Sequence, residues 1–590
     1  MEKWFIKNTK PENIDYEKFN LNKILYKVLV NRDIKTEDEI ERYLNPSLED
    51  LNTSLLLPDL IKASNLIMKN IEQNNKIRIV GDYDVDGVMS TYILYNGLLR
   101  LNANIDFDIP NRITDGYGIN KTIINRAKED NINLIITCDN GIAAFDAISY
   151  AKENNIDIIV TDHHEVVRNE LKEEVLPLAD AIINPKRDNS KYPFKEICGG
   201  VVAYKLIDYL YKINGINEDE LYNFLLPYAA IATVCDVMPL INENRIIVSN
   251  GLRYLNNTSD IGLSALIKSA MLEDKKIDVY HLGFVLGPTI NSSGRLEDAS
   301  IAIDLLLEKD ENKALEKAKY LRGLNVERQV LTDDGYNKID KQIEINNLMS
   351  KQKVLIVYDD DLNESVVGII AGRIKEKYNR PTIVLTYSNG ILKGSGRSID
   401  VYNMFEKVSE HKNLLESFGG HAMACGLSLK KENLEEFINL INKDADLTEE
   451  DLIKKVYMDL GLSLSNTDLN LAKQLEKFEP YGTANPNAVF GTKNLKVIRF
   501  SVFGKNKNVI KMILTDGMTS REILLFESID DFILKLSKEY PINEINNMIN
   551  NLNSNIFLDI VYTPSINSFR GNQNLELKIK NYRVSEGARC

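Results

Sequence analysis

Three aspartates stand close together in the stretch GDYDVDGVMS, residues 81–90, which places Asp82, Asp84 and Asp86 just before a glycine. The residues before them, KIRIV at 76–80, are largely β-branched and predict a buried strand. Residues 88–99 predict a helix. Carboxylate oxygens are the ligands that hard divalent cations prefer. The spacing therefore indicates a metal site in the loop between a strand and a helix.

Two other interpretations of this loop must be weighed. A calcium-binding EF-hand loop follows a helix and ends with a glutamate at position twelve. Counting from Asp82, position twelve is Ile93, and a strand precedes the loop, so the sequence disfavours an EF-hand. The second interpretation is a solvated acidic turn. Further acidic clusters in the same sheet would argue against it.

Such clusters follow two more predicted strands. Asp139 lies in CDNG at the end of NLIITCDNG (133–141), and Asp162, His163 and His164 end IDIIVTDHH (156–164). A fourth strand is predicted at 180–185, and helices are predicted over 118–129, 142–153 and 200–213. Strands that alternate with helices predict a doubly wound parallel sheet. Because parallel strands end at the same edge, where such sheets bind ligands, the clusters should converge.

Asp236, in ATVCDVMPL, is a further candidate. It follows an apolar, helix-like run, where a carboxylate is costly unless it is paired or bound to a metal. Each cluster also has a structural interpretation when taken alone. Asp162–His164 fit a helix cap with surface histidines, CDNG fits a plain turn, and Asp236 fits a buried cap. Their joint occurrence in one sheet pattern favours a shared site.

Convergent carboxylates repel one another unless they are protonated or neutralised by cations. A set of carboxylates and imidazoles without thiolates suits Mn²⁺ or Mg²⁺. Two such ions about 3.5–4 Å apart can grip an attacking water and a phosphoryl oxygen. The sequence therefore predicts two divalent metal ions and phosphoester hydrolysis.

The bulk composition is that of a soluble multidomain protein. The chain has 590 residues, which suggests roughly three to five domains. Five cysteines without a CxxC pair argue against a disulfide framework or a zinc ribbon and fit a reducing cytoplasm. MEKWFIKNTK has no apolar segment typical of a signal peptide, and no run of about 18 apolar residues predicts a membrane span.

The charge is unevenly distributed along the chain. The formal net charge is −14, yet residues 484–590 carry 14 Lys and Arg against 10 Asp and Glu. Six basic residues and no acidic residue lie between Lys493 and Lys511. An acidic body that holds metal ions, with a basic tail that touches a polyanion, would explain this asymmetry.

The patterns divide the chain into five regions. Residues 241–345 are helical, and Glu311–Asn347 predict one long connecting helix that Gly323 could interrupt. A second α/β pattern starts at VLIVY (354–358) and contains an expected glycine turn at 419–420. Short strands after EPYGTANPN (479–487) predict a small β domain, and the Asn-rich stretch 542–555 predicts a surface helix or insertion. The expected regions are 1–50 (helical extension), 51–240 (parallel sheet), 241–345, 346–450 and 451–590.

GDYDVDG, CDNG, TDHH and Asp236 together resemble the DHH phosphoesterase superfamily, and within it the RecJ family of single-strand-specific exonucleases. The resemblance extends over nearly the whole chain. Further matching motifs are CGGVVAYKL (198–206), INSSGRL (290–296), VVGIIAGRI (366–374), GSGRS (394–398), GGHAMACGLS (419–428) and PYGTANP (480–486). It implies an α/β multidomain fold: a DHH domain, a connecting helix, a smaller DHH-associated domain and a C-terminal OB-like β-barrel.

The resemblance also implies roles for individual residues. The implied metal ligands are Asp82, Asp84, Asp86, Asp139, His163 and Asp236. Of these, Asp82 could instead contact the other ligands without binding a metal ion itself. His164 resembles a histidine that contacts the scissile phosphate, and Asp162 would orient the imidazoles. The implied strand-binding residues are Arg295, Arg373, Ser395, Arg397, Gly419, Gly420 and His421. Without the resemblance, the arginines would fit solvated helix faces and the glycines a tight turn.

The family implies a 5′-to-3′ exonuclease that releases mononucleotides from single-stranded DNA in repair and recombination. A narrow passage between the two α/β domains would exclude duplex. The β domain would bind single-stranded DNA through its basic run, with Phe500 and Phe503 either stacking on bases or in the core. The implied partners are single-strand-binding protein and a RecQ-type helicase, with no membrane association, and we expect a monomer in the cytoplasm.

Three alternatives stay open. A DHH phosphodiesterase for short oligonucleotides or cyclic dinucleotides would generally lack the basic β domain, and an inorganic pyrophosphatase would be shorter. A catalytically inactive DNA-binding scaffold would lack a metal carboxylate, and none is missing here. Two stretches depart from the family pattern: DDDLNESVVG (359–368) lacks a Trp-His pair, and GPTINSS (287–293) has Thr289 where relatives often carry Arg. These departures affect the strand contacts and leave the metal chemistry unchanged.

Overall fold

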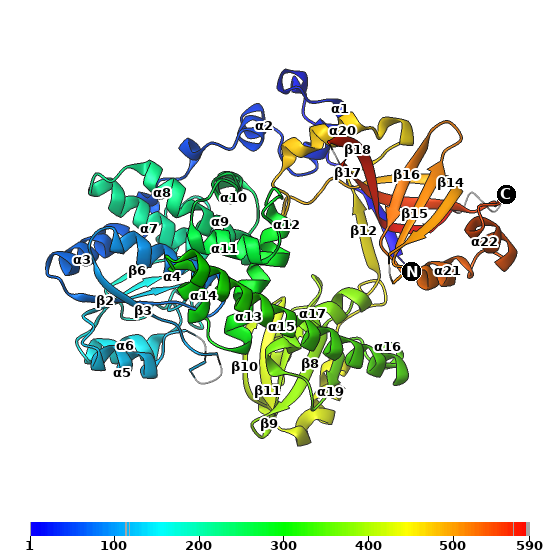
Figure 1. Cartoon of the computed structure of the whole chain (residues 1–590). Helices are drawn as coiled ribbons and strands as arrows, with labels where there is room; N and C mark the ends of the chain where they lie inside the picture. The colour runs from blue at the N-terminus through cyan, green and yellow to red at the C-terminus, as the bar shows by residue number, and fades with distance from the viewer. Residues whose placement is uncertain (1, 113–114, 117, 505, 570, 586–590) are drawn as a thin grey trace. The chain divides into compact units, whose positions relative to one another are not determined.

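The computed structural model describes residues 2–112, 115–116, 118–504, 506–569 and 571–585 (Figure 1). The chain forms two compact units, each assembled from segments that are distant in sequence. One, here called the two-sheet unit, comprises residues 51–238 and 250–454. The other, the barrel unit, comprises residues 1–50, 239–249 and 455–590.

The first sheet of the two-sheet unit is parallel throughout, as the alternation of strands and helices predicts. Its order is β3-β2-β4-β5-β6. The strands are β2 (Lys76–Val80), β3 (Asn104–Asp108), β4 (Leu134–Cys138), β5 (Asp157–Thr161) and β6 (Ala181–Ile183). The chain leaves β2 toward β3 on one side and then crosses to β4 on the other. Neighbouring connections thus diverge at the ends of β2 and β4, which is where such sheets bind ligands.

Helices cover both faces of this sheet (Figure 1). On one face α5 (Lys121–Glu129) and α6 (Phe145–Glu153) bury isoleucines and alanines against β4 and β5. On the other face lie α4 (Val85–Leu99) and α7 (Gly199–Ile213), which are apolar on most sides and almost fully buried. The loops after the strands are therefore held between rigid layers.

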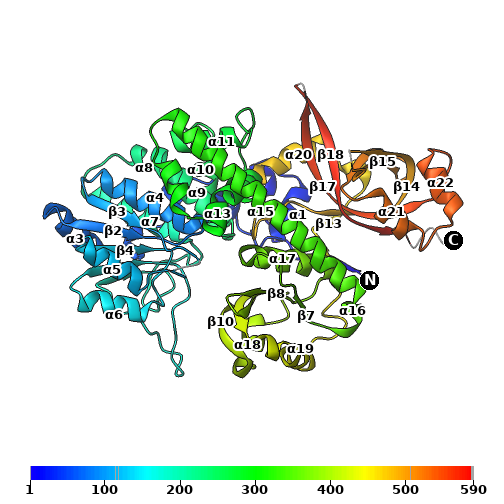
Figure 2. The same cartoon turned by 60° about the horizontal axis from the view of Figure 1, so that its bottom comes forward.

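Helices follow the first sheet, as the sequence predicts for 241–345. After α9 (Leu226–Cys235), which precedes this range, they are α10 (Asn242–Leu255), α11 (Ile261–Ser269), α12 (Val279–His281), α13 (Gly287–Leu296), α14 (Ser300–Leu306) and α15 (Glu311–Ile345). A π-helical turn at Leu282–Leu286 joins α12 to α13. Figure 2 shows α15 as one continuous helix, so Gly323 does not interrupt it; this residue is exposed and its φ is helical.

The second sheet has the order β10-β11-β9-β8-β7, and only β7 and β8 run parallel. Its strands are β7 (Leu355–Tyr358), β8 (Thr382–Ser388), β9 (Ile391–Arg397), β10 (Leu415–His421) and β11 (Ala424–Leu429). Helix α17 (Val367–Tyr378) packs against β8 and β9. Gly419 and Gly420 lie inside strand β10, so the expected turn at these glycines is wrong; the hairpin turn is at 422–423.

The barrel unit contains a closed five-stranded barrel. Strands β14 (Phe490–Phe503), β15 (Val509–Thr515), β16 (Ser520–Leu525), β18 (Asn572–Val584) and β17 (Phe557–Phe569) follow one another, and β17 pairs back onto β14. This closure confirms the predicted OB-like fold. Phe500 is 3% exposed and belongs to the core, whereas Phe503 is 52% exposed. The Asn-rich stretch forms α22 (Ile542–Ile549), which buries Ile545 and Met548.

The N-terminal residues share the core of the barrel unit, although the sequence suggests a separate helical extension over 1–50. Leu25 and Leu29 of α1 (Lys23–Val30) are fully buried in the same cluster as Phe478 and Phe490. Helix α2 (Glu37–Leu44) adds Tyr43, whose hydroxyl bonds Asn485. These contacts join residues more than 400 positions apart, and no local pattern reveals them.

Two further properties bear on the expectations from composition. The described cysteines, Cys138, Cys198, Cys235 and Cys425, all have free thiols. Among the described helices, none combines the length and apolarity that crossing a membrane requires.

Candidate active site

The aspartates after β2 are positioned by the start of α4. Asp84 is the N-cap of this helix, and its carboxylate accepts a hydrogen bond from the amide of Gly87 at 3.1 Å. Asp86, in the first helical turn, accepts two more bonds, from the amides of Gly199 and Gly200 at the start of α7, both at 2.7 Å. Asp82 is 3% exposed. The carboxylates of Asp84 and Asp86 are therefore held in fixed positions before any ligand binds, and that of Asp82 is enclosed beside them.

Asp139 follows β4 in a strained backbone conformation. Its φ is 61°, in the left-handed region that few residues other than glycine adopt, although asparagine and aspartate do so more often than most. The same turn buries Asn140, whose side-chain amide bonds the carbonyls of Val80 and Cys138. The turn directs the Asp139 carboxylate toward the loop after β2, and strain of this kind is typical of functional sites.

The Asp-His-His cluster after β5 is organised around Asp162. This buried carboxylate accepts bonds from the amides of Ile142, His163 and His164 and from the Nδ1 of His164 at 2.7 Å. His163 is 5% exposed, whereas the side chain of His164 is 46% exposed. Asp162 thus holds both histidines, one directed inward and one reaching solvent.

The side chains from the three strand ends and from α9 converge. His163 Nε2 lies 3.2 Å from Asp139 Oδ1 and 3.6 Å from both Asp86 Oδ2 and Asp236 Oδ2. Asp236 is the C-cap residue of α9. Three groups of side chains are close enough to hold a metal ion: Asp82–Asp84–Asp139, Asp86–His163–Asp236 and Asp139–His163–His164. The first two groups share no residue, which leaves room for two neighbouring ions.

The electrostatics of the cluster reflect this crowding. Burial, followed by the charge of Asp86, raises the pKa of Asp139 well above its ordinary range. Burial and the charge of Asp84 do the same for Asp82, and burial with the charge of Asp86 raises the pKa of Asp236 to about 9. Without cations, these carboxylates resist ionisation together.

The two histidines respond in opposite directions. Burial lowers the pKa of His163, which favours the neutral imidazole that can bind a metal. Burial also acts on His164, but the hydrogen bond and charge of Asp162 outweigh it and raise the pKa of His164 to about 9. Asp162 itself is buried, yet its bond with His164 lowers the pKa of this carboxyl to about 2. The site therefore pairs a neutral with a protonated imidazole.

The residues present fit divalent cations. Two buried oxygens, Oδ1 of Asp82 and Oδ2 of Asp236, have no hydrogen-bond partner among the described residues. Buried carboxylate oxygens without a donor are costly unless a cation faces them. The donors are carboxylates and one neutral imidazole, the set that Mn²⁺ and Mg²⁺ accept.

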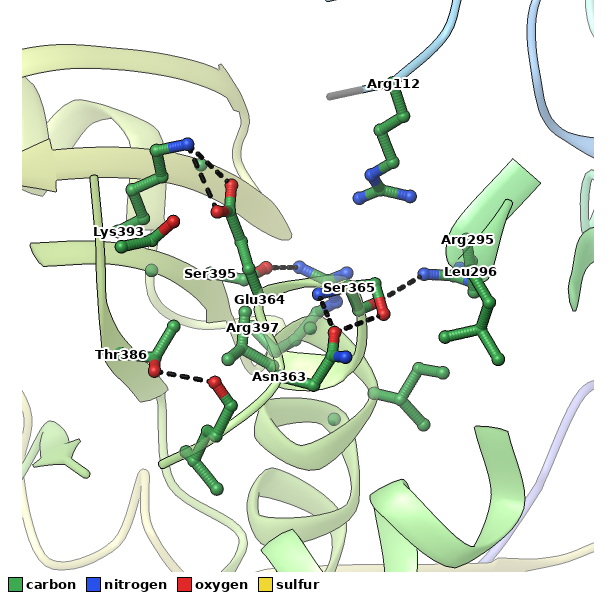
Figure 3. Close-up of a pocket in the computed structure, with 18 of the residues that line it drawn as sticks. Arg112, Arg295, Leu296, Asn363, Glu364, Ser365, Thr386, Lys393, Ser395 and Arg397 are labelled. Atoms are coloured by element: carbon green, nitrogen blue, oxygen red, sulfur yellow. Dashed lines mark hydrogen bonds and ion pairs between the residues drawn. The ribbon is translucent and has the colours of Figure 1, made fainter. Parts of the chain in front are cut away.

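A cavity of about 1330 Å³ adjoins the cluster (Figure 3). It begins at Tyr83, which stands between two of the candidate metal ligands, and it extends to strand β9. Five basic side chains line it: Arg112, Arg295, Arg373, Lys393 and Arg397. Figure 3 shows the guanidinium groups of Arg112 and Arg397 directed into the cavity. Arginine clusters of this kind suit phosphate groups.

The predicted strand-binding residues differ in their placement. Arg295 donates to the carbonyl of Ser365 at 3.0 Å, and Arg397 to the hydroxyl of Ser395 at 2.7 Å. Burial lowers the pKa of Arg295 to about 10. Arg373 forms an ion pair with Asp333 at the cavity wall.

Gly419, Gly420 and His421 are not among the residues that line the cavity. They lie in strand β10, on the far side of β11 from the cavity strand β9. Gly419 pairs with Gly426, and Gly426 does line the cavity. A side chain at Gly420 would meet the carbonyl of Ala424 at 2.3 Å, so close strand packing explains this glycine. A glycine pair can mark strand packing as well as a turn, and the sequence pattern does not separate the two.

Some residues of the site were missed in the sequence. Arg112, whose guanidinium lies 5.1 Å from the centre of the Tyr83 ring, comes from the loop after β3, a strand that the sequence pattern does not reveal. Lys186 follows β6 and bonds Glu165 at 2.9 Å, next to the histidine pair. Lys186 could have been predicted to lie near the site, because it directly follows the strand predicted at 180–185.

This arrangement defines a class of protein. A doubly wound sheet with convergent aspartates and a DHH triplet at its edge, followed by a second sheet with a basic cavity, is the architecture of a DHH-type phosphoesterase. Family models agree with this assignment. Residues 76–233 match the DHH family N-terminal domain, residues 351–445 the DHHA1 domain, and residues 458–581 the RecJ OB domain.

Known relatives narrow the assignment further. The chain is 33% identical to the single-stranded-DNA-specific exonuclease RecJ of Bacillus subtilis over 576 residues, which cover 97% of this chain and 69% of that protein. It is also 33% identical to the protein of that name from Haemophilus influenzae, with 93% and 94% covered. The chain belongs to the RecJ family.

A solved structure has the same fold. RecJ of Thermus thermophilus in complex with Mn²⁺ superimposes with a TM-score of 0.81 and 23% identity, covering 99% of this chain and 80% of that chain. The fold class predicted from the sequence is therefore confirmed.

Proposed function

We propose that the chain is a metal-dependent exonuclease that degrades single-stranded DNA from the 5′ end and releases mononucleotides. Its membership of a family whose curated members are named single-stranded-DNA-specific exonucleases supports the substrate. The observation that carries the proposal is the cluster of six candidate metal ligands together with the arginine-lined cavity, which Tyr83, between Asp82 and Asp84, helps to line. The direction of degradation rests on the family resemblance alone.

Two divalent ions, Mn²⁺ or Mg²⁺, would be held by Asp82, Asp84, Asp86, Asp139, His163 and Asp236. When bound, such ions polarise the phosphodiester and lower the pKa of water. The ions would offset most of the charge of the carboxylates and so oppose the effects of burial and mutual repulsion that raise the pKa values of Asp139 and Asp82.

His164 is suited to hold the scissile phosphate. Its Nδ1 bonds Asp162, and its side chain is 46% exposed, so the imidazole reaches solvent beside the metal cluster. Because the pKa of His164 is raised to about 9, its other ring nitrogen carries a proton at neutral pH and can donate to a phosphate oxygen. Asp162 keeps the ring oriented and charged.

The cavity is suited to hold the strand next to the scissile bond. Arg295 and Arg397 are fixed by bonds to Ser365 and Ser395, so little side-chain entropy is lost when they contact phosphate. Ser395 and Gly426 face each other across β9 and β11, and Gly419 continues this row on β10. We place the bases and sugars along this row, and propose that duplex DNA is too wide to enter.

An assay with end-labelled DNA tests the proposal. A 5′-labelled and a 3′-labelled single strand, each with a duplex control, would be incubated with the protein and Mn²⁺. We expect labelled mononucleotide from the first turnover with the 5′-labelled single strand, only at the end of degradation with the 3′-labelled single strand, and none from either duplex. Asp139→Ala should lower the rate by roughly 10³-fold, since loss of a metal ligand costs several kcal/mol of transition-state stabilisation. Asp188→Asn, at an exposed aspartate paired with Arg168, is the matched control and should leave the rate unchanged.

Other outcomes would overturn the proposal in distinct ways. Cleavage confined to strands of a few nucleotides or to cyclic dinucleotides would indicate a small-substrate phosphodiesterase. Salt-dependent DNA binding without cleavage, equal for the native protein and Asp139→Ala, would indicate an inactive scaffold. Equal cleavage of duplex and single strands would contradict the proposed role of the cavity.

We also propose that the enzyme works in the cytoplasm beside single-strand-binding protein and a RecQ-type helicase, in repair and recombination. The family resemblance supports these partners, and the free thiols of the described cysteines fit a reducing compartment. Purified single-strand-binding protein and helicase should each co-elute with the native chain; elution of each protein alone would contradict the proposal.

A further inference from the structure

A two-stranded ribbon at the N-terminus lies outside the barrel strands and outside the cavity. Strand β1 (Glu2–Ile6) pairs with β12 (Lys454–Met458), and the amide of Lys7 continues the pairing to the carbonyl of Met458 at 2.9 Å. Side chains alternate between the two faces of such a ribbon. The two faces here differ sharply in character.

One face packs on the barrel. The guanidinium of Arg583 on β18 lies over the indole of Trp4, 4.5 Å from the centre of the ring. Glu2 accepts a hydrogen bond from the side-chain amide of Asn581 at 2.6 Å. Met458 is 5% exposed. These contacts attach the ribbon to the barrel unit and fix which side chains point outward.

The outward face consists of two lysines and two aromatic residues: Lys3, Phe5, Lys455 and Tyr457. All four are exposed. The rings of Phe5 and Tyr457 stack across the two strands, with centres 5.4 Å apart and planes 26° from parallel. No acidic side chain of either strand shares this face. We call these four residues the ribbon face.

We propose that the ribbon face binds single-stranded nucleic acid, with a base stacked on the Phe5–Tyr457 pair and the two lysines against flanking phosphates. Exposed aromatic rings among basic residues are the features that proteins use to hold single strands without sequence preference. The lysines favour a polyanion over an apolar protein partner. The inference rests on the proposed function for the identity of the strand, and adds a contact that the catalytic cavity does not contain.

A consequence is that strand length should matter. The ribbon belongs to the barrel unit and the cavity to the two-sheet unit, so one short oligonucleotide need not reach both. A strand that engages both should bind more tightly through the higher effective concentration of the second contact. Acidic residues at 449–451 precede β12, so the gain should be moderate and sensitive to salt.

The test measures binding of fluorescent oligo-dT of about 10 and about 60 nucleotides to full-length protein, in the Asp139→Ala background to prevent cleavage. We expect the combined substitutions Phe5→Ala and Tyr457→Ala to weaken binding of the long strand about tenfold and to leave binding of the short strand unchanged. The pair Phe5→Tyr and Tyr457→Phe retains the rings and should restore binding. Lys3→Glu with Lys455→Glu should weaken binding and flatten its salt dependence.

A matched control is available in the two-sheet unit. Tyr280 and Phe284 also form an exposed stacked pair, with ring centres 5.1 Å apart, and Tyr280→Ala with Phe284→Ala should leave long-strand binding unchanged. Equal loss in this control would overturn the proposal, because it would reflect general loss of aromatic surface. Unchanged long-strand binding in the Phe5→Ala, Tyr457→Ala protein would also overturn it.

Cleavage of the short strand separates this inference from the proposed function. If the otherwise native protein with the ribbon substitutions cleaves the short strand normally but loses long-strand affinity, both stand. If the native protein cleaves no strand, the proposed function fails. If the ribbon substitutions abolish binding of an acidic aromatic peptide while long-strand binding persists, the face is a peptide site and the inference fails.

Discussion

At the scale of single residues, ionising the buried carboxyls of the site costs free energy, and bound metal ions should lower this cost. Burial and neighbouring aspartates raise the pKa of Asp236 to about 9 in the metal-free protein, and burial likewise raises the pKa of Asp139 well above its ordinary value. A carboxyl whose folded pKa is raised stabilises the fold at low pH and loses that contribution as pH rises through the folded pKa. His164, raised to about 9 by Asp162 against the effect of burial, loses its contribution over the same range.

We therefore predict that metal-free protein becomes less stable between about pH 6 and pH 9. The melting temperature of the two-sheet unit, followed by calorimetry after chelation, should fall across this range. Excess Mn²⁺ should oppose the fall, because deprotonated ligands bind the ion. Asp236→Asn should flatten the metal-free profile, since the amide does not titrate. A metal-free melting temperature that stays constant or rises with pH would contradict the prediction.

The aspartates and histidines of the metal cluster could be predicted because each follows a strand in the sequence, and parallel strands end together. Arg112 could not, because its loop follows β3, whose alternating aspartates hide the strand pattern. Thr289, at the position where relatives often carry arginine, is buried and donates to the carbonyl of Val285. This position therefore supports helix packing here and supplies no charge to the strand.

At the scale of elements, the site depends on how closely α7 approaches α4. The amides of Gly199 and Gly200 bond the carboxylate of Asp86. A Cβ on Gly200 would meet the Cβ of Ala232 on α9 at 2.6 Å and Oδ1 of Asp86 on α4 at 3.2 Å. We predict that Gly200→Ala destabilises the protein by about 1–3 kcal/mol and weakens Mn²⁺ binding, because α7 must move away from Asp86. Thermal unfolding and calorimetric titration with Mn²⁺ measure both effects.

Gly323 provides the matched control for this substitution. It is also a helical glycine, but it is exposed on α15 and an added Cβ would meet nothing within 4 Å. Gly323→Ala should stabilise the protein by roughly 0.5–1 kcal/mol, through lower entropy of the unfolded chain. If Gly200→Ala leaves both stability and Mn²⁺ affinity unchanged, the close approach of α7 is not needed for the site.

Elements with strong periodicity were predictable, and weakly patterned elements were not. The buried isoleucines and valines of β4 and β5 predict both strands, and the unbroken charged repeat of 311–345 predicts α15. Strand β10 carries Gly419 and Gly420, which locally favour a turn. Residues 415–421 nevertheless form a strand, because they pair with β11. This pairing is a tertiary contact that overrides the local preference for a turn.

At the scale of the whole molecule, the sequence order misrepresents the units. Composition and motifs place the domain limits along the chain. The barrel unit, however, combines three segments of the chain: residues 1–50, 239–249 and 455–590. Arg245 illustrates this, since its guanidinium donates to the carbonyls of Tyr43, Phe478 and Glu479. Such contacts join segments that are separated by about 200 residues on each side, and no local sequence signal specifies them.

This organisation predicts that a substitution near the N-terminus acts on the C-terminal barrel. Leu29 on α1 is fully buried in the core that it shares with Phe490 and Tyr562. Leu29→Ala should destabilise the barrel unit by about 2–5 kcal/mol, through lost burial and the cavity left behind.

Calorimetry can assign the effect to one unit. Mn²⁺ binds the two-sheet unit, so it should raise the transition temperature of that unit and identify the other transition as that of the barrel unit. Leu385→Ala, at an equally buried leucine of β8, is the control and should lower the Mn²⁺-sensitive transition instead. If Leu29→Ala lowers the Mn²⁺-sensitive transition and leaves the other in place, residues 1–50 do not belong to the folding unit of the barrel.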